Sequence, residues 1–225
     1  MAVYNGASYL QEQIASVLPQ LSHQDELIIS DDGSTDETPQ IISNFKDPRI
    51  KYLENRGKKG VAGNFENGLK AATGNYIFLS DQDDIWFPEK VEKVMEKLQT
   101  FSCVLHNATL VDAQGNPSDQ NLFHIYGTRP GFWKNLKRNT FVGCCMAFRR
   151  DILKYALPFP EKIKMHDMWI ALISEKRANT ALISEPLMYY RRHGHNASTT
   201  SQKSSFTLGY QLKYRTEMLM CLLGK

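Results

Sequence analysis

The 225-residue sequence has few of the features that mark a disulfide-rich or zinc–thiolate protein. Its four cysteines include no C-x-x-C pair, and two of them, Cys144 and Cys145, are adjacent. Adjacent cysteines are poorly placed to build a disulfide framework, so the sequence predicts neither disulfides nor a zinc site. A reducing compartment therefore suits the chain better than an oxidising one.

Long apolar runs and a targeting segment are also missing. No uninterrupted apolar stretch approaches the roughly 20 residues that cross a bilayer. The N-terminus lacks the basic and then apolar pattern of a signal peptide. We therefore expect a soluble, cytoplasmic protein.

A strong excess of charge of either sign is absent as well. The 27 Lys and Arg residues against 24 Asp and Glu residues give a formal net charge of +3. This balance argues against a nucleic-acid binder and against an acidic tail. It is compatible with an anionic small substrate and with an anionic membrane surface, and it does not decide between them.

The first hundred residues alternate between strand and helix periodicity. Strand-like apolar runs occupy residues 26–31, 49–54 and 76–80. Amphipathic helical spacings lie between them, and Pro88 is well placed to open a further helix. Alternating elements predict an α/β fold with a mostly parallel sheet and helices on both faces. The helical patterns cover residues 10–17, 41–45, 65–72 and 91–98.

The pattern is less regular beyond residue 102. A strand is predicted over residues 103–111, and a second apolar run covers residues 141–148. Residues 202–225 repeat apolar side chains at spacings of four, which predicts an amphipathic helix. This tail could pack on the core or lie on a membrane surface. At the other end, Met1–Tyr4 matches only the last half of a strand, so we expect the first strand to be truncated.

The strongest polar cluster is Asp81-Gln82-Asp83-Asp84, directly after the strand-like run 76–80. Ligands bind at the carboxyl ends of the strands of an open α/β sheet. Three carboxylates within four residues repel one another unless a cation lies among them, and Mg²⁺ or Mn²⁺ bridging a diphosphate would satisfy them. A solvated turn that caps the next helix is the simpler alternative. A calcium EF-hand loop is excluded, because Trp86 stands where that loop needs glycine.

Two weaker clusters also follow apolar segments. In the run from Asp31 to Asp36, a carboxylate could accept the imide N–H of a uracil or thymine ring, but the same residues would cap an ordinary strand-to-helix turn. Asp167, between Met165 and Trp169, could be desolvated enough to act as a general base. A helix N-cap is its simpler interpretation.

The motifs YNG, DDGSTD, SDQDDIWFPEK, GCCM, HDMW and YRRHGHN, in this order and spacing, resemble the family 2 inverting glycosyltransferases of GT-A fold. The closest pattern is that of the bacterial rhamnosyltransferases. The resemblance extends from the first residues to about residue 196, and DQDDIW followed by P-E-K is its most specific part. It implies a Rossmann-like GT-A domain over residues 1–201. Residues 1–100 would form the nucleotide-binding half and residues 101–201 the acceptor-side half, with 202–225 as a separate helix.

The resemblance also implies residue roles. Asp167 matches the catalytic base, and Asp83 matches the metal-binding residue of the D-x-D motif. Asp81 would lie near the ribose or the metal, and His193, otherwise an ordinary surface histidine, would close over the metal and diphosphate. The nucleotide-binding set is completed by Ala2 and Tyr4 flanking the base and by Asp32 and Asp31 at its imide. One departure is Gly63, where many relatives carry a basic residue.

The resemblance implies transfer of a sugar, with rhamnose one candidate, from a UDP- or dTDP-type donor to a glycan or lipid-linked acceptor, with inversion, in cell-surface polysaccharide synthesis. Two alternatives stay open. A nucleotidyltransferase would share the sheet, metal and nucleotide, but the loop Asn5–Tyr9 lacks the basic residue that it would need. A non-catalytic module that binds sugar nucleotides or glycans is the other alternative.

Overall fold

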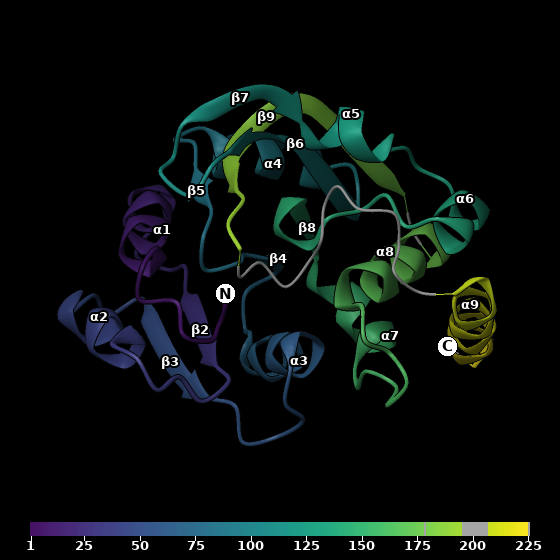
Figure 1. Cartoon of the computed structure of the whole chain (residues 1–225), viewed down its shortest axis with the longest axis horizontal. Coiled ribbons are helices and arrows are strands. Elements are labelled where there is room, and N and C mark those ends of the chain that lie inside the picture. The colour runs from purple at the N-terminus through teal and green to yellow at the C-terminus, as the bar shows by residue number, and fades with distance from the viewer. Residues whose placement is uncertain (178, 195–206, 225) are drawn as a thin grey trace.

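The computed structural model describes residues 1–177, 179–194 and 207–224 (Figure 1). Its N-terminal part is a three-stranded sheet in the order β1-β2-β3, all parallel. The strands are β1 (Ala2–Val3), β2 (Leu27–Asp31) and β3 (Ile50–Glu54). Every residue of β2 is buried, as expected for the central strand of a parallel sheet. The helices of this part are α1 (Leu10–Val17), α2 (Thr38–Asn44) and α3 (Val61–Ala71), and a 3₁₀ turn, η1 (Leu18–Gln20), follows α1.

The second sheet is mixed and corrects the expectation of mostly parallel pairing. Its order is β4-β8-β6-β9-β5, with β7 pairing to β6, and only β6 and β9 are parallel neighbours. Antiparallel neighbours need no crossover helix, and the chain indeed loses its regular helix–strand alternation beyond residue 102. The strands are β4 (Tyr76–Phe78), β5 (Ile85–Trp86), β6 (Cys103–Val111), β7 (Pro117–Asn121), β8 (Met146–Arg149) and β9 (Thr180–Arg191).

A backbone hydrogen bond links the two sheets at the edge that carries the acidic loops. The Ala2 amide donates to the Ser80 carbonyl, 3.2 Å away, just beyond β4. The loops that follow β1, β2 and β4 therefore lie next to one another. This arrangement places the DDGS and DQDD motifs on one edge of the molecule, as expected for ligand-binding loops of an α/β sheet.

The central helix of the second half is α8 (His166–Arg177), which the sequence did not reveal as a regular pattern. All residues from Met168 to Ile173 are at most 4% exposed, so the helix is buried on nearly every side. The Trp169 indole N–H donates to the Ala156 carbonyl at 2.9 Å, which satisfies its one polar atom inside the core. The remaining elements of this half are α4 (Lys90–Leu98), α5 (Leu122–Tyr126), α6 (Phe132–Lys137), η2 (Gly143–Cys145), η3 (Arg150–Ile152) and α7 (Leu153–Ala156).

The C-terminal tail forms the helix α9 (Leu208–Leu223) within the range expected for it, although residues 202–206 and 225 lie outside the described part. Met218 and Leu222 are almost fully buried, and they belong to the same core cluster as α8. The helix therefore packs on the core, the first of its two expected fates. Within the described residues, no helix has the length and apolar character that crossing a membrane requires.

Candidate active site

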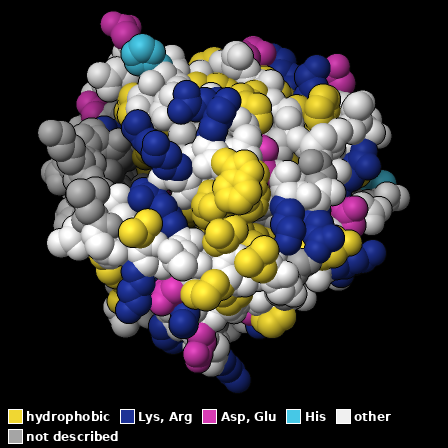
Figure 2. Space-filling model, turned by 90° about the vertical axis from the view of Figure 1, so that its right-hand side faces the viewer, with side chains coloured by type: hydrophobic (Ala, Val, Ile, Leu, Met, Phe, Trp, Pro, Cys, Tyr) yellow, Lys and Arg dark blue, Asp and Glu magenta, His cyan; other side chains and the backbone are white. Residues whose placement is uncertain are grey.

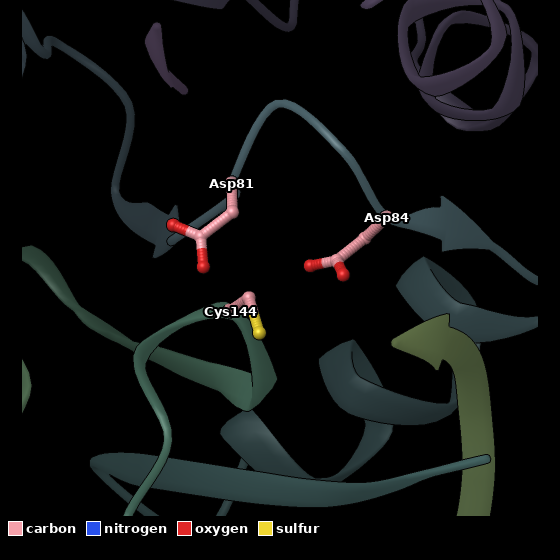
Figure 3. A group of neighbouring side chains, drawn as sticks. All are labelled: Asp81, Asp84 and Cys144. Carbon is pink, nitrogen blue, oxygen red and sulfur yellow. The ribbon is translucent and has the colours of Figure 1, made fainter. Parts of the chain in front are cut away.

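The acidic loop Asp81–Asp84 connects β4 to β5 and bends over η2. The carboxylate oxygens of Asp81 and Asp84 and the Cys144 sulfur all lie within 4.8 Å of one another. Figure 3 shows the two carboxylates converging on the side of the loop that faces Cys144. Asp84 is buried and one of its oxygens, Oδ2, has no hydrogen-bond partner among the described residues. Two converging carboxylates with an unsatisfied oxygen repel each other unless a cation or a proton lies between them.

The pKa values of Asp81 and Asp84 reflect their burial and the closeness of other negative charges. Burial, followed by the charges of Asp83 and Asp167, raises the pKa of Asp81 to about 7. Burial, followed by the charges of Asp83 and Asp81, holds the pKa of Asp84 well above its usual value. A bound cation would reverse both effects, because it favours the ionised carboxylate.

The donor set fits a hard divalent ion. Carboxylate oxygens are preferred ligands of Mg²⁺ and Mn²⁺, and Asp84 Oδ2 is free to take such a role. The Cys144 thiol suits softer metals, and interaction with Cys145 and burial raise its pKa well above the usual value. The carboxylates, and not the thiol, are therefore the atoms of this group that could hold such an ion.

Asp83 and His193, which the sequence predicted for the metal site, are in contact. His193 Nε2 lies 2.8 Å from Asp83 Oδ2, and both side chains are largely shielded from solvent. The His193 ring also stacks on Tyr9, with centroids 4.7 Å apart and an interplanar angle of 26°. The histidine is thus held over the acidic loop from the far end of β9, although 110 residues separate it from Asp83.

Arg191 fixes the backbone of the acidic loop. Its Nε donates to the Asp83 carbonyl at 3.0 Å, and its backbone amide donates to Asp84 Oδ1 at 3.3 Å. The guanidinium also donates to the Ala113 carbonyl and forms an ion pair with Glu12 of α1. One buried side chain therefore ties α1, the acidic loop and the β6–β7 turn together.

Lys90 supplies a buried positive charge below the loop. Its side chain is 1% exposed, and Nζ donates to the Cys144 carbonyl at 3.1 Å and lies 3.8 Å from the centre of the Trp86 ring. Burial lowers the pKa of Lys90 to about 8, while the nearby acidic groups, including Asp84 and Asp81, act in the opposite direction. The ammonium is therefore still mostly protonated at pH 7 and partly offsets the aspartates.

The carboxylates of the DDGS motif are engaged in local hydrogen bonds. Asp31 is buried and accepts from the amides of Gly33 and Ser34, the Ser34 hydroxyl and the Tyr52 hydroxyl. Asp32 accepts from the Asn55 side chain and the Gly60 amide, each at 2.7 Å. Gly33 has a φ of +96°, a conformation that glycine tolerates best. The motif is thus a tightly fixed turn, which leaves Asp32 the more accessible of the two carboxylates.

Ala2 and Tyr4 lie on either side of the buried Val3, next to the acidic loop. Gln82 Oε1 accepts from the Tyr4 amide at 2.8 Å, and Gln82 Nε2 donates to the Tyr4 carbonyl at 3.1 Å. This paired contact leaves the Tyr4 ring 57% exposed. An exposed aromatic ring with a fixed backbone is a suitable platform for a planar base.

Asp167 lies in the first turn of α8, close enough to the acidic loop for its charge to act on Asp81. Burial raises its pKa to about 6, and its charge in turn contributes to the raised pKa of Asp81. The Met168 amide donates to Asp167 Oδ1 at 2.6 Å, and Asn139 Nδ2 lies 3.5 Å from Oδ2. A carboxylate with a pKa near 6 is well suited to accept a proton at neutral pH.

His166, the neighbouring titratable residue, has a different environment. Its ring stacks on Phe65 with centroids 3.9 Å apart, and burial lowers its pKa to about 3. A Cβ atom at Gly143 would lie only 2.8 Å from His166 Nε2, so η2 packs closely against this turn. These contacts make Asp167 the better base of the two.

The structure thus gathers Asp81, Asp83, His193 and Asp167 around one loop, as their sequence motifs suggested. It adds Lys90 and Arg191, to which the sequence analysis gave no role. Asp84 was expected only as one of the three carboxylates of the acidic run, and the structure shows that it is buried with one unsatisfied oxygen. Lys90 and Arg191 lie in the quoted motifs without a predicted role, and their burial beside the acidic loop reveals their place in the site.

Sequence comparisons identify the relatives of this chain. A model of the family "Glycosyl transferase family 2" matches residues 1–156. The glucosyltransferase WfgD of Escherichia coli, described as acting on α-D-GlcNAc-diphosphoundecaprenol with UDP-Glc, is 30% identical over 181 residues, which cover 78% of this chain and 68% of that protein. The dTDP-rhamnosyl transferase RfbG of Shigella flexneri is 30% identical over 216 residues, covering 87% of this chain and 72% of that protein.

Solved structures with the same fold include two glycosyltransferases. TarS from S. aureus in complex with UDP-GlcNAc superposes with a TM-score of 0.70 at 17% identity, over 99% of this chain and 71% of that one. Glucosyl-3-phosphoglycerate synthase from Mycobacterium tuberculosis in complex with Mn²⁺, UDP and glucosyl-3-phosphoglycerate has a TM-score of 0.59 at 16% identity, over 99% of this chain and 77% of that one. The expected α/β GT-A fold is confirmed by these likenesses. Together with the family match, they show that the chain is an enzyme, a GT-A glycosyltransferase that belongs to glycosyl transferase family 2.

Proposed function

We propose that the chain transfers a sugar from a nucleoside diphosphate to a glycan or lipid-linked hydroxyl, with inversion at the anomeric carbon, in the synthesis of a cell-surface polysaccharide. The donor would be of the UDP or dTDP type, and rhamnose is one candidate sugar. The relatives that use UDP-Glc, dTDP-rhamnose and a diphosphoundecaprenol-linked acceptor support this proposal. The reaction would take place on the cytoplasmic side of a membrane.

One observation carries the proposal. Asp167 and Asp81 lie close enough for the charge of Asp167 to raise the pKa of Asp81, although they come from opposite halves of the chain. A base near an acidic loop that could bind a cation suits direct displacement at the anomeric carbon. The base would accept the proton of the acceptor hydroxyl on one side of the sugar, and the loop would hold the diphosphate leaving group on the other.

The residues would divide the work as follows. Asp167 takes the proton from the acceptor hydroxyl as the oxygen attacks the anomeric carbon. Asp83 and Asp81, with His193 and the buried Asp84, would hold Mg²⁺ or Mn²⁺, and the bound ion would neutralise charge on the departing diphosphate. Arg191 keeps the backbone of the loop in place. The dry surroundings of Asp84 and Asp167 strengthen these electrostatic effects.

The nucleotide would lie along the edge formed by β1, β2 and β4. Tyr4 and Ala2 would flank the base, and Asp32, with Asp31 fixing the turn, would accept its imide N–H. No Lys or Arg follows β1 directly, since this loop reads Asn5-Gly6-Ala7-Ser8-Tyr9. This composition favours sugar transfer over nucleotidyl transfer.

A panel of nucleoside-diphosphate sugars, assayed for hydrolysis with Mn²⁺ or Mg²⁺, tests the proposal. We expect one UDP or dTDP sugar to be hydrolysed with release of the nucleoside diphosphate, and EDTA to stop the reaction. Transfer to a diphosphoundecaprenol-linked acceptor, followed by NMR of the new anomeric bond, then tests inversion. Binding of a free sugar without turnover of any donor would instead identify a binding module.

A further inference from the structure

The helix α9 is apolar on two faces, only one of which is covered. Met218 and Leu222 point into the core and are at most 1% exposed. Leu212, Met220 and Leu223 are 67%, 57% and 74% exposed. Positions 212, 220 and 223 fall on one side of a helix with 3.6 residues per turn, so these side chains form an outward apolar row. A helix that only covered the core would carry polar side chains there.

A second exposed apolar group comes from α6, which packs against α9. Trp133 is 70% exposed, and its ring packs edge-on against Phe132 with centroids 5.1 Å apart. Figure 2 shows the side of the molecule that carries α6 and α9, with hydrophobic side chains gathered at its middle. We call Trp133, Leu212, Met220 and Leu223 the α6–α9 face.

Positive charges surround the α6–α9 face. Lys134, Lys137, Arg138 and Lys213 are exposed, and Figure 2 shows Lys and Arg on both sides of the hydrophobic group. The acidic residue within α6 and α9 is Glu217, which pairs with Lys162 at 3.6 Å. At the end of α9, Lys176 donates to the Leu222 carbonyl at 2.6 Å. A tryptophan and leucines within a ring of lysines match a bilayer with anionic headgroups, because the rings and aliphatic chains enter the interface while the ammonium groups remain among the phosphates.

The α6–α9 face is connected to the catalytic side of the molecule. The Tyr214 hydroxyl of α9 accepts from the backbone amides of Lys164 and Met165, each at 3.2 Å. These residues directly precede the turn that carries Asp167. A surface that holds α9 against a bilayer would therefore also set the distance between the bilayer and the base.

We propose that the α6–α9 face docks on an anionic phospholipid bilayer and positions Asp167 beside a lipid-linked acceptor. The second half of this statement rests on the proposed function, since it assumes a lipid-linked acceptor. The docking itself does not, because it depends only on the apolar row and its basic surroundings.

Vesicle co-sedimentation tests the docking. We expect the protein to bind vesicles that contain phosphatidylglycerol and to remain in the supernatant with pure phosphatidylcholine. Trp133→Gln and Leu212→Gln should each weaken partitioning several-fold, and together about tenfold or more. Val61→Gln, which changes an exposed apolar side chain on α3, should have no effect. Lys213→Glu should weaken binding at low salt, whereas Lys97→Glu on α4 should not.

The sedimentation assay needs a test of folding, a test for dimers and a separate activity assay. Circular dichroism and melting curves establish that each variant is folded. Equal sedimentation of wild type and the double variant would overturn the proposal. So would a dimer in light scattering that the same substitutions dissociate without any effect of lipid, because the face would then join two copies of the chain. Donor hydrolysis, assayed without vesicles, reports separately on the proposed function, so the two ideas can fail independently.

Discussion

At the scale of single residues, the site depends on carboxylates whose surroundings oppose their ionisation. Asp81, Asp84 and Asp167 all have raised pKa values, and burial is the main cause for each. Folding therefore makes the ionised form of these three carboxyl groups less favourable than it is in water. Such residues concentrate where a protein binds ions or moves protons.

The first prediction concerns Asp167. Asp167→Asn removes the proton acceptor and keeps the shape of the side chain. We expect nucleoside-diphosphate affinity to stay within about a factor of three of wild type, while transfer falls about 10²-fold or more, the usual contribution of a general base. Isothermal titration and a transfer assay measure the two effects. Asp151→Asn, an exposed aspartate in η3, is the matched control.

The pH dependence provides a further check on the same residue. With a pKa of about 6, Asp167 is ionised above that pH and protonated below it. Wild-type transfer should therefore rise with pH through about 6 and level off near neutrality, whereas residual transfer by Asp167→Asn should lack this step. Normal transfer by the variant would make Asp167 a helix cap, and joint loss of donor binding and transfer would make it part of the donor site.

The second prediction concerns the metal. Asp83→Asn removes a charge and weakens the contact with His193. We expect hydrolysis of the donor to fall by orders of magnitude and Mn²⁺ affinity to fall with it, while the melting temperature changes little. Asp119→Asn on the exposed strand β7 serves as the control. Full activity of Asp83→Asn, or of the wild type in EDTA, would refute the assignment.

At the scale of elements, local patterns predicted the first half of the chain well. The strands expected over residues 26–31 and 49–54 and the helix over residues 10–17 are present with nearly the same bounds. The helix has a regular hydrophobic period, and the two strands are short apolar runs bounded by polar residues. The run 76–80 is a shorter strand, β4, although the Leu79 amide still donates to the Met146 carbonyl.

The second half shows where such patterns fail. The run 141–148 is buried at seven of its eight positions, so it has no period to distinguish a strand from a turn. Residues Gly143–Cys145 in the middle of this run form a 3₁₀ turn, and β8 begins only at Met146. Strand β9 contains Glu185 and Pro186, which interrupt its apolar pattern, so the sequence did not predict it. Pro186 lies opposite Asn107, where the register with β6 shifts, a place that tolerates proline.

The third prediction concerns α9. Tyr214→Phe removes the hydroxyl that accepts from two amides before Asp167. We expect a loss of about 1–2 kcal/mol in the free energy of unfolding, the usual cost of lost hydrogen bonds. The transfer kcat should fall about tenfold, equivalent to about 1.4 kcal/mol, with the donor KM nearly unchanged.

Tyr155→Phe on α7, which removes the hydroxyl of a partly exposed tyrosine and keeps the ring under Arg177, is the control. Denaturant unfolding and steady-state kinetics separate the two effects of Tyr214→Phe. Equal losses in kcat and in donor affinity would show that α9 supports the whole site and does not specifically position the base.

At the scale of the whole molecule, the acidic site couples stability to pH. A carboxyl whose pKa rises on folding binds more protons in the native state than in the unfolded one, so its contribution to stability falls as pH rises between the two pKa values. For Asp81 this interval runs from about 4 to about 7. Burial lowers the pKa values of His166 and His106. Their contribution to stability therefore increases as the pH rises, up to about pH 6.5, the pKa of an unperturbed histidine.

The fourth prediction therefore compares the free energy of unfolding of Asp81→Asn with that of the wild type. In EDTA, Asp81→Asn should gain stability relative to wild type as the pH rises from 5 to 7.5, because the histidine contributions cancel in the comparison. Saturating Mn²⁺ should stabilise the wild type more at pH 7.5 than at pH 5, and the variant less than the wild type. Urea unfolding at both pH values measures this. A difference that does not change with pH would show that the Asp81 carboxyl is not perturbed by folding.

The buried Lys90 has a consequence for the charge balance of the site. The three aspartates of the loop carry three negative charges when ionised, and the Lys90 ammonium, which is mostly protonated at pH 7, would offset one of them. The remaining two would match the charge of one divalent ion, which fits the Mg²⁺ or Mn²⁺ proposed for this loop. Without such an ion, the raised pKa values of Asp81 and Asp84 would favour their protonated forms. Proton uptake by these two carboxyl groups would then limit the negative charge of the loop beside the nucleoside diphosphate.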